Sequence, residues 1–332
     1  MTSPAKNRWR RALRRLAPAV AVLAVAVPVW SPASSVAGAA TAARAPLRLL
    51  VEPGAGIGPI DALLAHARHS VDLVIYELDD VRTESLLAAD AARGVRVRVL
   101  LDETYERSRN AAAYAYLARH HVEVRWAHDA GIYLTHEKAA VVDGKTAIVM
   151  TLNLVANYYT TTRDFAVLDT QRRDVAAIEA VFAADWDRRA IRPASGVDLV
   201  WSPGAETPLV RLIEGARHSL LIENEEMSDP YITAPLEAAA RRGVRVEVVM
   251  TASSSWAPAF DALVRAGVRV RTYGTSAPLY IHAKAIVADA GRAGARVFVG
   301  SENFSIASLV YDRELGLLTG APAIVNGVAT TI

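Results

Sequence analysis

The chain contains an internal repeat, and this repeat limits the folds open to it more than any other feature. The tetrapeptide Ala-Arg-His-Ser at 67–70 occurs again at 216–219, an offset of 149 residues. The pentapeptide Arg-Gly-Val-Arg-Val at 93–97 occurs again at 242–246, with the same offset of 149. This period is too long for the stacked units of a solenoid. The sequence therefore predicts two fused copies of one domain.

Within each copy, apolar residues recur first with helical and then with strand spacing. Gly94 and Gly243 follow the second helix of each copy, as C-terminal capping glycines do. Alternation of helix and strand is typical of the α/β class. The Pro, Ser and Gly residues of 191–196 break the pattern, so we expect domains at 44–194 and 195–332. The predicted elements are helices 60–69 and 83–93 with strands 71–76 and 95–101, then helices 209–218 and 234–242 with strands 220–223 and 244–250.

Residues 1–43 have the layout of a secretory signal peptide. A basic stretch at 8–15 precedes an apolar stretch of 14 residues at 17–30, and small residues follow. The apolar stretch is interrupted by Pro28 and is short for a membrane span, although a retained anchor is the alternative. We therefore expect a secreted, extracellular protein.

The charge balance changes once this segment is set aside. The whole chain has 37 basic and 35 acidic residues, but residues 1–43 hold six of the basic residues and no acidic one. The remainder has 31 basic and 35 acidic residues, a net charge of −4. A slightly acidic protein lacks the global positive charge of a typical nucleic-acid binder. The absence of cysteine excludes thiolate catalysis, disulfides and cysteine-bound zinc, and we expect neither a metal nor a cofactor.

Both copies contain the pattern H-x-K-x4-D, at 136–143 and at 282–289. Residues two apart in a strand share a face, so each pattern places an imidazole beside an ammonium group. The sequence Asp143-Gly144 is typical of a two-residue hairpin turn. In that register the numbers of opposite residues add up to 287, which places Thr151 opposite the histidine and Asn153 on the same face.

The second hairpin is longer by four residues, an even number that preserves the face. Opposite residues then add up to 583, which places Ser301 opposite His282. Each copy is thus expected to gather a histidine, a lysine, a hydroxyl and an asparagine. The solvated edge of a sheet would explain a single H-x-K, but two equivalent copies, each followed by [ST]-x-N, favour a functional site.

These groups suit phosphodiester chemistry. Lysines, hydroxyls and amides stabilise the negative charge on phosphoryl oxygens in the transition state without a metal. One histidine attacks phosphorus, and the other protonates the leaving alcohol. Because each copy supplies only one such histidine, His136 and His282 are expected to form one composite site.

Each imidazole also needs a partner that fixes its tautomer, usually a carboxylate. Asp164 lies 28 residues after His136, and Glu314 lies 32 residues after His282. These positions are equivalent once the four extra hairpin residues are counted, and both follow an arginine. We expect the two carboxylates to orient the two histidines; the alternative is that each pairs with the arginine beside it.

The doubled pattern H-x-K-x4-D-x6-G-[ST]-x-N resembles the phospholipase D superfamily, and the resemblance covers nearly the whole chain after residue 43. It implies an α/β fold of two similar α/β/α domains, packed as a pseudo-twofold dimer with the active site at their interface. It also implies a phosphohistidine intermediate, with His136 as nucleophile and His282 as general acid. The catalytic residues that it implies are His136, Lys138, Asn153, His282, Lys284 and Asn303, and the supporting residues are Thr151, Ser301, Asp164, Glu314, Asp143 and Asp289.

The sequence departs from this pattern in three places, one of which is the four extra residues of the second hairpin. Met150 stands where the pattern has the glycine that the second copy keeps as Gly300. The second copy also has fewer residues after its motif, which predicts a shorter last helix. In the superfamily the motif aspartates, here Asp143 and Asp289, are mainly structural, in agreement with a turn at that point.

The leading interpretation of the substrate is a phospholipid at a membrane or micelle surface, hydrolysed at its head-group phosphodiester by a monomer. The apolar runs Ile132-Tyr133-Leu134 and Leu279-Tyr280-Ile281 before the two histidines suit acyl chains, although burial in strands explains them equally well. A secreted endonuclease of the same superfamily, acting on nucleic acid through arginine-rich strands near Arg96 and Arg269, is the alternative. A catalytically inactive binding module is the third interpretation.

Overall fold

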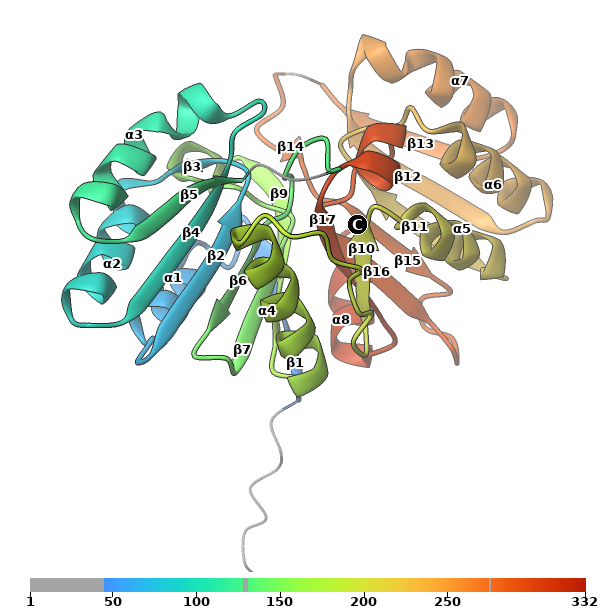
Figure 1. The fold of residues 1–332 in the computed structure, drawn as a ribbon. Coiled ribbons are helices and arrows are strands. Elements are labelled where there is room, and N and C mark those ends of the chain that lie inside the picture. Colours follow the sequence, from blue (N-terminus) through green and yellow to red (C-terminus); the bar gives the residue numbers. More distant parts are fainter. Residues whose placement is uncertain (1–44, 128–130, 275) are drawn as a thin grey trace, which may run out of the picture. The chain divides into compact units, whose positions relative to one another are not determined.

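The computed structural model describes residues 45–127, 131–274 and 276–332, so the signal peptide expected at 1–43 lies outside the described residues. The described chain forms two large sheets flanked by helices (Figure 1). Their strand orders are β1-β9-β7-β6-β2-β4-β5 and β10-β17-β16-β15-β11-β12-β13. Strand for strand, the second order repeats the first, and the sequence repeat is therefore a repeat of topology.

The elements of the two halves have the following bounds. The first half contains β1 (Leu47–Glu52), α1 (Gly58–Ala65), β2 (Ser70–Ile75), β3 (Leu78–Asp79), α2 (Val81–Ala92), β4 (Arg96–Asp102), α3 (Arg107–Arg119), β5 (Glu123–Ala127), β6 (Ala139–Val142), β7 (Thr146–Met150), β8 (Leu154–Val155), η1 (Ala156–Tyr158), β9 (Thr162–Asp169) and α4 (Arg172–Trp186). The second half contains β10 (Leu199–Ser202), α5 (Glu206–Gly215), β11 (Ser219–Glu223), α6 (Pro230–Arg241), β12 (Arg245–Thr251), η2 (Ser254–Trp256), α7 (Ala257–Arg265), β13 (Arg269–Tyr273), β14 (Tyr280–Ile281), β15 (Ala285–Ala288), β16 (Arg296–Gly300), η3 (Ala307–Tyr311), β17 (Glu314–Thr319) and α8 (Pro322–Ala329).

Each sheet mixes parallel and antiparallel pairs. In the first sheet β2, β4 and β5 run parallel, and the motif hairpin of β6 and β7 adds antiparallel strands that continue into β9 and β1. The second sheet has the same pattern, with β11, β12 and β13 as its parallel strands. Parallel strands need crossover connections, which the helices predicted from the apolar periodicity provide.

The two halves share one apolar core. Helices α1 to α3 cover the outer face of the first sheet, and α5 to α7 cover that of the second (Figure 1). Between the inner faces, Val149 and Phe165 of the first half lie in the same cluster as Val299 and Leu315 of the second, together with residues of α4 and α8. Strand β14 of the second half also pairs in parallel with β9 of the first. The predicted α/β fold with two similar halves is therefore confirmed.

The predicted helices and strands are confirmed, with small shifts at their ends. Gly94 and Gly243 follow α2 and α6 with φ angles of +89° and +90°, a conformation that favours glycine. Helix α8 has 8 residues against 15 in α4, so the last helix is shorter as predicted. The domain boundary expected after residue 194 falls between α4 and β10 and stays a prediction. None of the described helices is long and apolar enough to span a membrane.

The predicted register of the motif hairpins is wrong by one residue. Val142 pairs with Thr146, so opposite residues add up to 288 and the turn has three residues instead of two. Ala288 pairs with Arg296, which gives 584 in the second hairpin. The turn of the second hairpin is longer by four residues, as predicted. The predicted alignment of Thr151 and Ser301 with the two histidines is consequently wrong.

The motif aspartates explain the longer turn. Asp143 has a left-handed φ of +56°, and its carboxylate accepts the backbone N–H groups of Arg68, His69 and Ser70 at 3.0, 2.7 and 3.0 Å. Asp289 accepts the equivalent N–H groups of the repeated tetrapeptide at 3.1, 2.6 and 3.0 Å. Against the effect of burial, these hydrogen bonds hold the pKa of both carboxyls below the ordinary value. The carboxylate therefore ties the hairpin to the loop before β2 or β11, a structural task.

Close packing across β16 and β17 gives a first prediction. Gly300 lies opposite Gly316, and a Cβ added to Gly300 would lie 2.5 Å from the Gly316 Cα. Because neither backbone can move without disturbing the sheet, Gly300→Ala is expected to lower the free energy of unfolding by about 2 kcal/mol. Urea denaturation followed by circular dichroism measures this change. Met150, the equivalent residue of the first half, lies opposite Ala166 and is buried without such a contact.

Gly215→Ala is the matched control for this stability measurement. Gly215 ends α5, and no atom lies within 4 Å of a Cβ added there. Alanine has the higher helix propensity, so this variant should be as stable as the wild type or slightly more stable. Equal stability of both variants and the wild type would contradict the close approach of Gly300 and Gly316.

Candidate active site

Each H-x-K segment runs beside a strand of the other half. The His136 N–H donates to the Arg313 carbonyl oxygen at 3.0 Å, just before β17. In the same way, the Ala283 N–H donates to the Arg163 carbonyl oxygen at 2.8 Å, at the start of β9. The H-x-K segment of each half is therefore hydrogen-bonded to the backbone of the other half, in the same way on both sides.

This arrangement brings the predicted carboxylates to the histidines across the interface. The distance between His136 Nδ1 and Glu314 Oε2 is 2.8 Å, and that between His282 Nδ1 and Asp164 Oδ1 is also 2.8 Å. Each histidine thus uses the carboxylate of the other half. The sequence spacing identified the four residues as equivalent pairs but contained no signal for this crossing.

The alternative prediction, in which each carboxylate pairs with the arginine beside it, is wrong. Arg313 forms an ion pair with Asp185 at 2.9 Å instead of with Glu314. Arg163 lies 3.8 Å from Glu223. Both carboxylates are thereby left to the imidazoles.

The predicted hydroxyls lie behind the carboxylates. Thr151 Oγ1 donates to Asp164 Oδ1 at 2.6 Å and accepts the Phe165 N–H at 2.9 Å. In the second half, the Ser308 hydroxyl donates to Glu314, while Ser301 Oγ accepts the Leu315 N–H at 3.2 Å. The hydroxyl groups therefore fix the two carboxylates and the strands that carry them. Sequence reasoning missed Ser308, which lies on η3 outside the repeated motif.

Both motif lysines are fully buried. Lys138 Nζ donates to the His136 carbonyl oxygen at 2.7 Å and lies 4.9 Å from the centre of the Tyr76 ring. Burial lowers the pKa of Lys138 to about 7, although the charge of Glu314 opposes this effect. Lys284 Nζ donates to the His282 carbonyl oxygen and, at 2.9 Å, to Glu225. Lys284 and the protonated fraction of Lys138 are desolvated cations that interact strongly with an anion that enters the site.

The two imidazoles differ in their electrostatic surroundings. Burial and the positive charges of Lys138 and Lys284 hold the pKa of His136 well below its ordinary value, so this ring is neutral at pH 7. Burial likewise raises the pKa of its partner Glu314 to about 7. Asp164 is also buried, but the His282 ring and then Lys284 keep its pKa below the ordinary value. An ionised carboxylate therefore stands behind His282, and a neutral imidazole stands in the first half.

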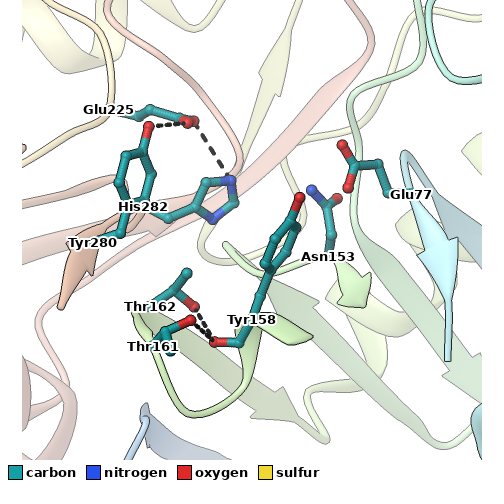
Figure 2. Close-up of a pocket in the computed structure, with 8 residues that line it drawn as sticks. All are labelled: Glu77, Asn153, Tyr158, Thr161, Thr162, Glu225, Tyr280 and His282. Atoms are coloured by element: carbon teal, nitrogen blue, oxygen red, sulfur yellow. Dashed lines mark hydrogen bonds and ion pairs between the residues drawn. The ribbon is translucent and has the colours of Figure 1, made fainter. Parts of the chain in front are cut away.

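A cavity of about 380 Å³ opens beside His282 (Figure 2). The side-chain oxygens of Asn153 and Asn303 are buried and have no hydrogen-bond partner among the described residues. These oxygens accept hydrogen bonds, whereas phosphoryl oxygens need the Nδ2 groups of the two amides as donors, and Asn303 Nδ2 donates to Glu226 Oε1 at 3.4 Å. The cavity is lined by Glu77, Asn153, Tyr158, Thr161, Thr162, Glu225, Tyr280 and His282.

Two residues next to the histidines were missed by the sequence reasoning. The Tyr76 ring packs edge-on against His136, with ring centres 4.6 Å apart. Glu225, 149 residues later, contacts Lys284 and His282. Both follow the first parallel strand of their half, β2 or β11. Applying the offset of 149 beyond the repeated tetrapeptide identifies Tyr76 and Glu225 as equivalent positions with chemically different side chains.

The apolar runs before the histidines have mixed surroundings. Leu134 and Ile281 are buried, as ordinary strand residues are, whereas Tyr133 and Tyr280 are 53% and 41% exposed. Tyr280 lines the cavity beside His282. A second cavity, of about 500 Å³, is lined by Gly131, Ile132, Tyr133, Ala307 and Tyr311.

The arrangement provides a nucleophile, a proton donor and anion-binding groups. Neutral His136 has a lone pair on Nε2, while Asp164 lies 2.8 Å from Nδ1 of His282 and fixes the direction of that ring. The lysines and asparagines are available to bind phosphoryl oxygens. Within the ranges that the structure describes, no group of three or more His, Cys, Asp or Glu side chains is placed to hold a metal ion.

Known proteins resemble the chain in sequence and in fold. A sequence model of the family described as "Cardiolipin synthase, PLD-like domain" matches twice, at residues 60–186 and 209–331. A comparison with curated proteins gives no match. Among solved structures, phosphatidylserine synthase from Haemophilus influenzae Rd KW20 has a TM-score of 0.63 and 13% identity, over 86% of this chain and 85% of that chain.

Two further solved structures are similar over different lengths. Polyphosphate kinase from Porphyromonas gingivalis has a TM-score of 0.64 and 16% identity over 86% of this chain, which spans 49% of the kinase. Nuc, a phospholipase D family member from Salmonella typhimurium, has 19% identity and a TM-score of 0.39, over 45% of this chain and 98% of its own. The family matches span well over half of the sequence. The chain therefore belongs to the phospholipase D superfamily, whose enzymes act on phosphodiester bonds, and carries two PLD-like domains on one polypeptide.

Proposed function

We propose that the protein is a phosphodiesterase that hydrolyses the head-group ester of a phospholipid through a phosphohistidine. The observation that carries this proposal is the pair of imidazoles from opposite halves, each 2.8 Å from a carboxylate and each followed by a buried lysine. This arrangement supplies the nucleophile, the general acid and the positive charge that phosphoryl transfer requires when no metal ion takes part.

The proposed reaction has two steps. First, the Nε2 lone pair of neutral His136 attacks phosphorus, the bond from phosphorus to the alcohol oxygen breaks, and that oxygen takes the Nε2 proton of His282. Second, a water molecule gives a proton to His282 as its oxygen attacks phosphorus, and the electrons of the broken N–P bond return to His136. The products are an alcohol and a phosphomonoester, and both histidines regain their starting protonation states.

The lining of the site supports a lipid substrate. Glu77 and Glu225 line the cavity beside His282 and pair with Arg109 and Lys284 at 3.1 and 2.9 Å, so these pairs leave little net positive charge for the successive phosphates of a nucleic-acid strand. The second cavity, lined by Ile132, Tyr133 and Tyr311, is suited to an acyl chain. Exposed tyrosines such as Tyr133 and Tyr280 are also typical of surfaces that meet a lipid–water interface.

The endonuclease alternative has weaker support. Arg98 and Arg96, in the arginine-rich strand of the first half, lie 2.7 and 3.4 Å from Asp72. Arg271 in the second half lies 3.4 Å from Glu247. These carboxylates neutralise much of the charge that would bind a phosphate backbone.

The site of action and the oligomeric state also belong to this proposal. The composition of residues 1–43 supports export and action outside the cell. One polypeptide carries both histidines and both carboxylates, which supports a catalytically sufficient monomer.

The proposed substrate gives a second prediction. In mixed micelles, the protein without residues 1–43 is expected to release the head-group alcohol from phosphatidylcholine or phosphatidylethanolamine at least roughly tenfold faster than it cleaves single-stranded DNA. The reason is that the two carboxylates of the cavity neutralise Arg109 and Lys284, so little positive charge is left for the successive phosphates of DNA. Choline or ethanolamine release and oligonucleotide cleavage are measured at equal phosphodiester concentration.

Three controls define the outcome. Activity is expected to persist in EDTA, because lysines supply the charge that a metal supplies elsewhere; complete loss restored only by a metal would contradict this expectation. Ethanol tests for transfer to an alcohol, since a phosphohistidine that reacts with ethanol instead of water yields phosphatidylethanol. Efficient DNA cleavage without lipid turnover would reverse the choice of substrate.

A further inference from the structure

The two half-sites are unlike at one pair of equivalent positions. Tyr76 follows β2 and packs edge-on against His136, whereas Glu225 follows β11 and approaches His282. Both residues occupy the same place in the repeat, 149 positions apart. A phenol in one half thus corresponds to a carboxylate in the other.

Glu225 is held in place by groups on three segments. The Tyr280 hydroxyl donates to Glu225 Oε1 at 2.8 Å (Figure 2). Lys284 Nζ donates to Oε2 at 2.9 Å. The Trp256 indole N–H donates to the Glu225 carbonyl oxygen at 3.1 Å. Burial opposes ionisation, but Lys284 and His282 keep the pKa of Glu225 well below its ordinary value. Glu225 is therefore a fixed negative charge.

This charge lies beside the ring nitrogen that faces the substrate. Glu225 Oε2 is 3.5 Å from His282 Nε2, while Asp164 Oδ1 is 2.8 Å from Nδ1 of the same ring. Each nitrogen of this ring therefore has a carboxylate oxygen nearby that can accept a hydrogen bond from it. His136 has a carboxylate at Nδ1 and the Tyr76 ring beside it, an arrangement that favours the neutral ring.

We propose that Glu225 is a positioning residue that keeps His282 protonated on Nε2 and aims this proton at the leaving oxygen, so that the second half-site is the acid. The proposal rests on the proposed phosphodiesterase function. Other charges also act at this point: Lys284 disfavours the protonated ring, and Glu225 offsets this effect through its contact with Lys284 Nζ. The charged and titratable groups around His282 and the neighbouring His136 include Asp164, Glu225, Glu226, Glu77, Glu314, Lys284, Lys138, Tyr280 and Tyr76.

A general acid matters only when the leaving group needs a proton. The choline oxygen leaves as a strongly basic alkoxide unless it is protonated, whereas p-nitrophenolate leaves without a proton. Phosphatidylcholine and phosphatidyl-p-nitrophenol differ only in this alcohol, and a residue that acts through the acid affects them unequally. A residue that only neutralises Lys284 or supports the fold affects both alike.

The test compares Glu225→Gln with the wild type on these two lipids in the same micelles. We expect kcat for phosphatidylcholine to fall roughly 10- to 100-fold, the effect of losing one contact with a charged group. For phosphatidyl-p-nitrophenol we expect a fall of less than about threefold.

Three further variants complete the comparison. Glu225→Asp keeps the charge and should retain much of the wild-type ratio of the two rates. Glu225→Tyr copies the first half-site and should behave like Glu225→Gln. Glu237→Gln removes a partly exposed carboxylate of α6, where Glu237 contacts Arg241 at 3.1 Å, and should change neither rate.

Equal losses on both lipids, or no loss, would overturn the role of Glu225. If circular dichroism shows that Glu225→Gln folds poorly, Glu225→Asp becomes the deciding variant. A ratio of its rates on phosphatidylcholine and phosphatidyl-p-nitrophenol that is far from the wild-type ratio would contradict the proposal. If the wild type cleaves neither lipid, the lipid function fails. The same comparison is then made with a dinucleotide and a nucleoside p-nitrophenyl phosphate, on which the inference about Glu225 stands or falls separately.

Discussion

Replacing His136 with alanine should lower kcat for a phosphodiester roughly 10³- to 10⁴-fold, and replacing His282 should have an effect of similar size on a substrate with a basic leaving group. The double variant should be little worse than either single variant, because nucleophile and acid act in the same step. Initial rates of all three proteins measure these effects, with circular dichroism to verify folding. Near-normal turnover in either single variant would disprove a composite site.

The two histidines should also differ in what they leave behind. Without His282, phosphatidyl-p-nitrophenol still transfers its phosphatidyl group to His136, since p-nitrophenolate needs no proton, but activation of water is impaired. His282→Ala should therefore give a burst of about one p-nitrophenolate per protein and a phosphorylated His136. Mass spectrometry locates the label. A label on His282 of the His136→Ala protein, with none on His136 of the other variant, would invert the two roles.

Removing the carboxylates should be the next most damaging change. Asp164→Asn and Glu314→Gln each replace the group that lies 2.8 Å from a histidine Nδ1, and each should lower kcat roughly 100-fold by releasing the tautomer and direction of the ring. Because the partners cross between the halves, Asp164→Asn weakens the acid and Glu314→Gln weakens the nucleophile. The rate of phosphatidyl-p-nitrophenol cleavage, which needs no acid, should then change little in Asp164→Asn but should fall in Glu314→Gln.

This difference between the two lipids separates crossed from uncrossed pairing. If each carboxylate served the histidine of its own half, the two variants would exchange their substrate patterns. Near-wild-type rates in both would show that neither carboxylate supports catalysis. Thermal denaturation of both variants provides the control for folding, because an amide keeps only one acceptor oxygen for the hydroxyl and the histidine that each carboxylate contacts.

The sequence was sufficient to predict the repeated topology, because apolar periodicity and capping glycines act locally. It was also sufficient to identify His136 and His282 together with Asp164 and Glu314, because the spacing is the same in both copies. It failed by one residue at the turns, since Asp143 is drawn to the N–H groups of 68–70, a contact across the fold that outweighs the local preference for a two-residue turn.

The crossing of the carboxylates and the role of Glu225 were beyond the sequence for a different reason. A repeat shows which positions are equivalent. It does not show whether each carboxylate pairs with the histidine of its own half or with that of the other half. Only the parallel pairing of each H-x-K segment with the other half, at Arg313 and at Arg163, decides between them. Glu225 was overlooked because it differs from Tyr76, and a search for similarity between copies passes over the positions at which they differ.

The crossed carboxylates have a consequence for the history of the chain. Two identical subunits related by a twofold axis satisfy the same crossing, with each subunit completing the histidine of its twin. A single gene for such an ancestor would place the same residue beside both imidazoles, so neither could specialise without changing the other. Duplication within one reading frame removes that constraint. After duplication, position 76 can become tyrosine while position 225 becomes glutamate. One histidine can then always act as nucleophile and the other as acid, whereas in a symmetric dimer either histidine could take either role each time a substrate binds.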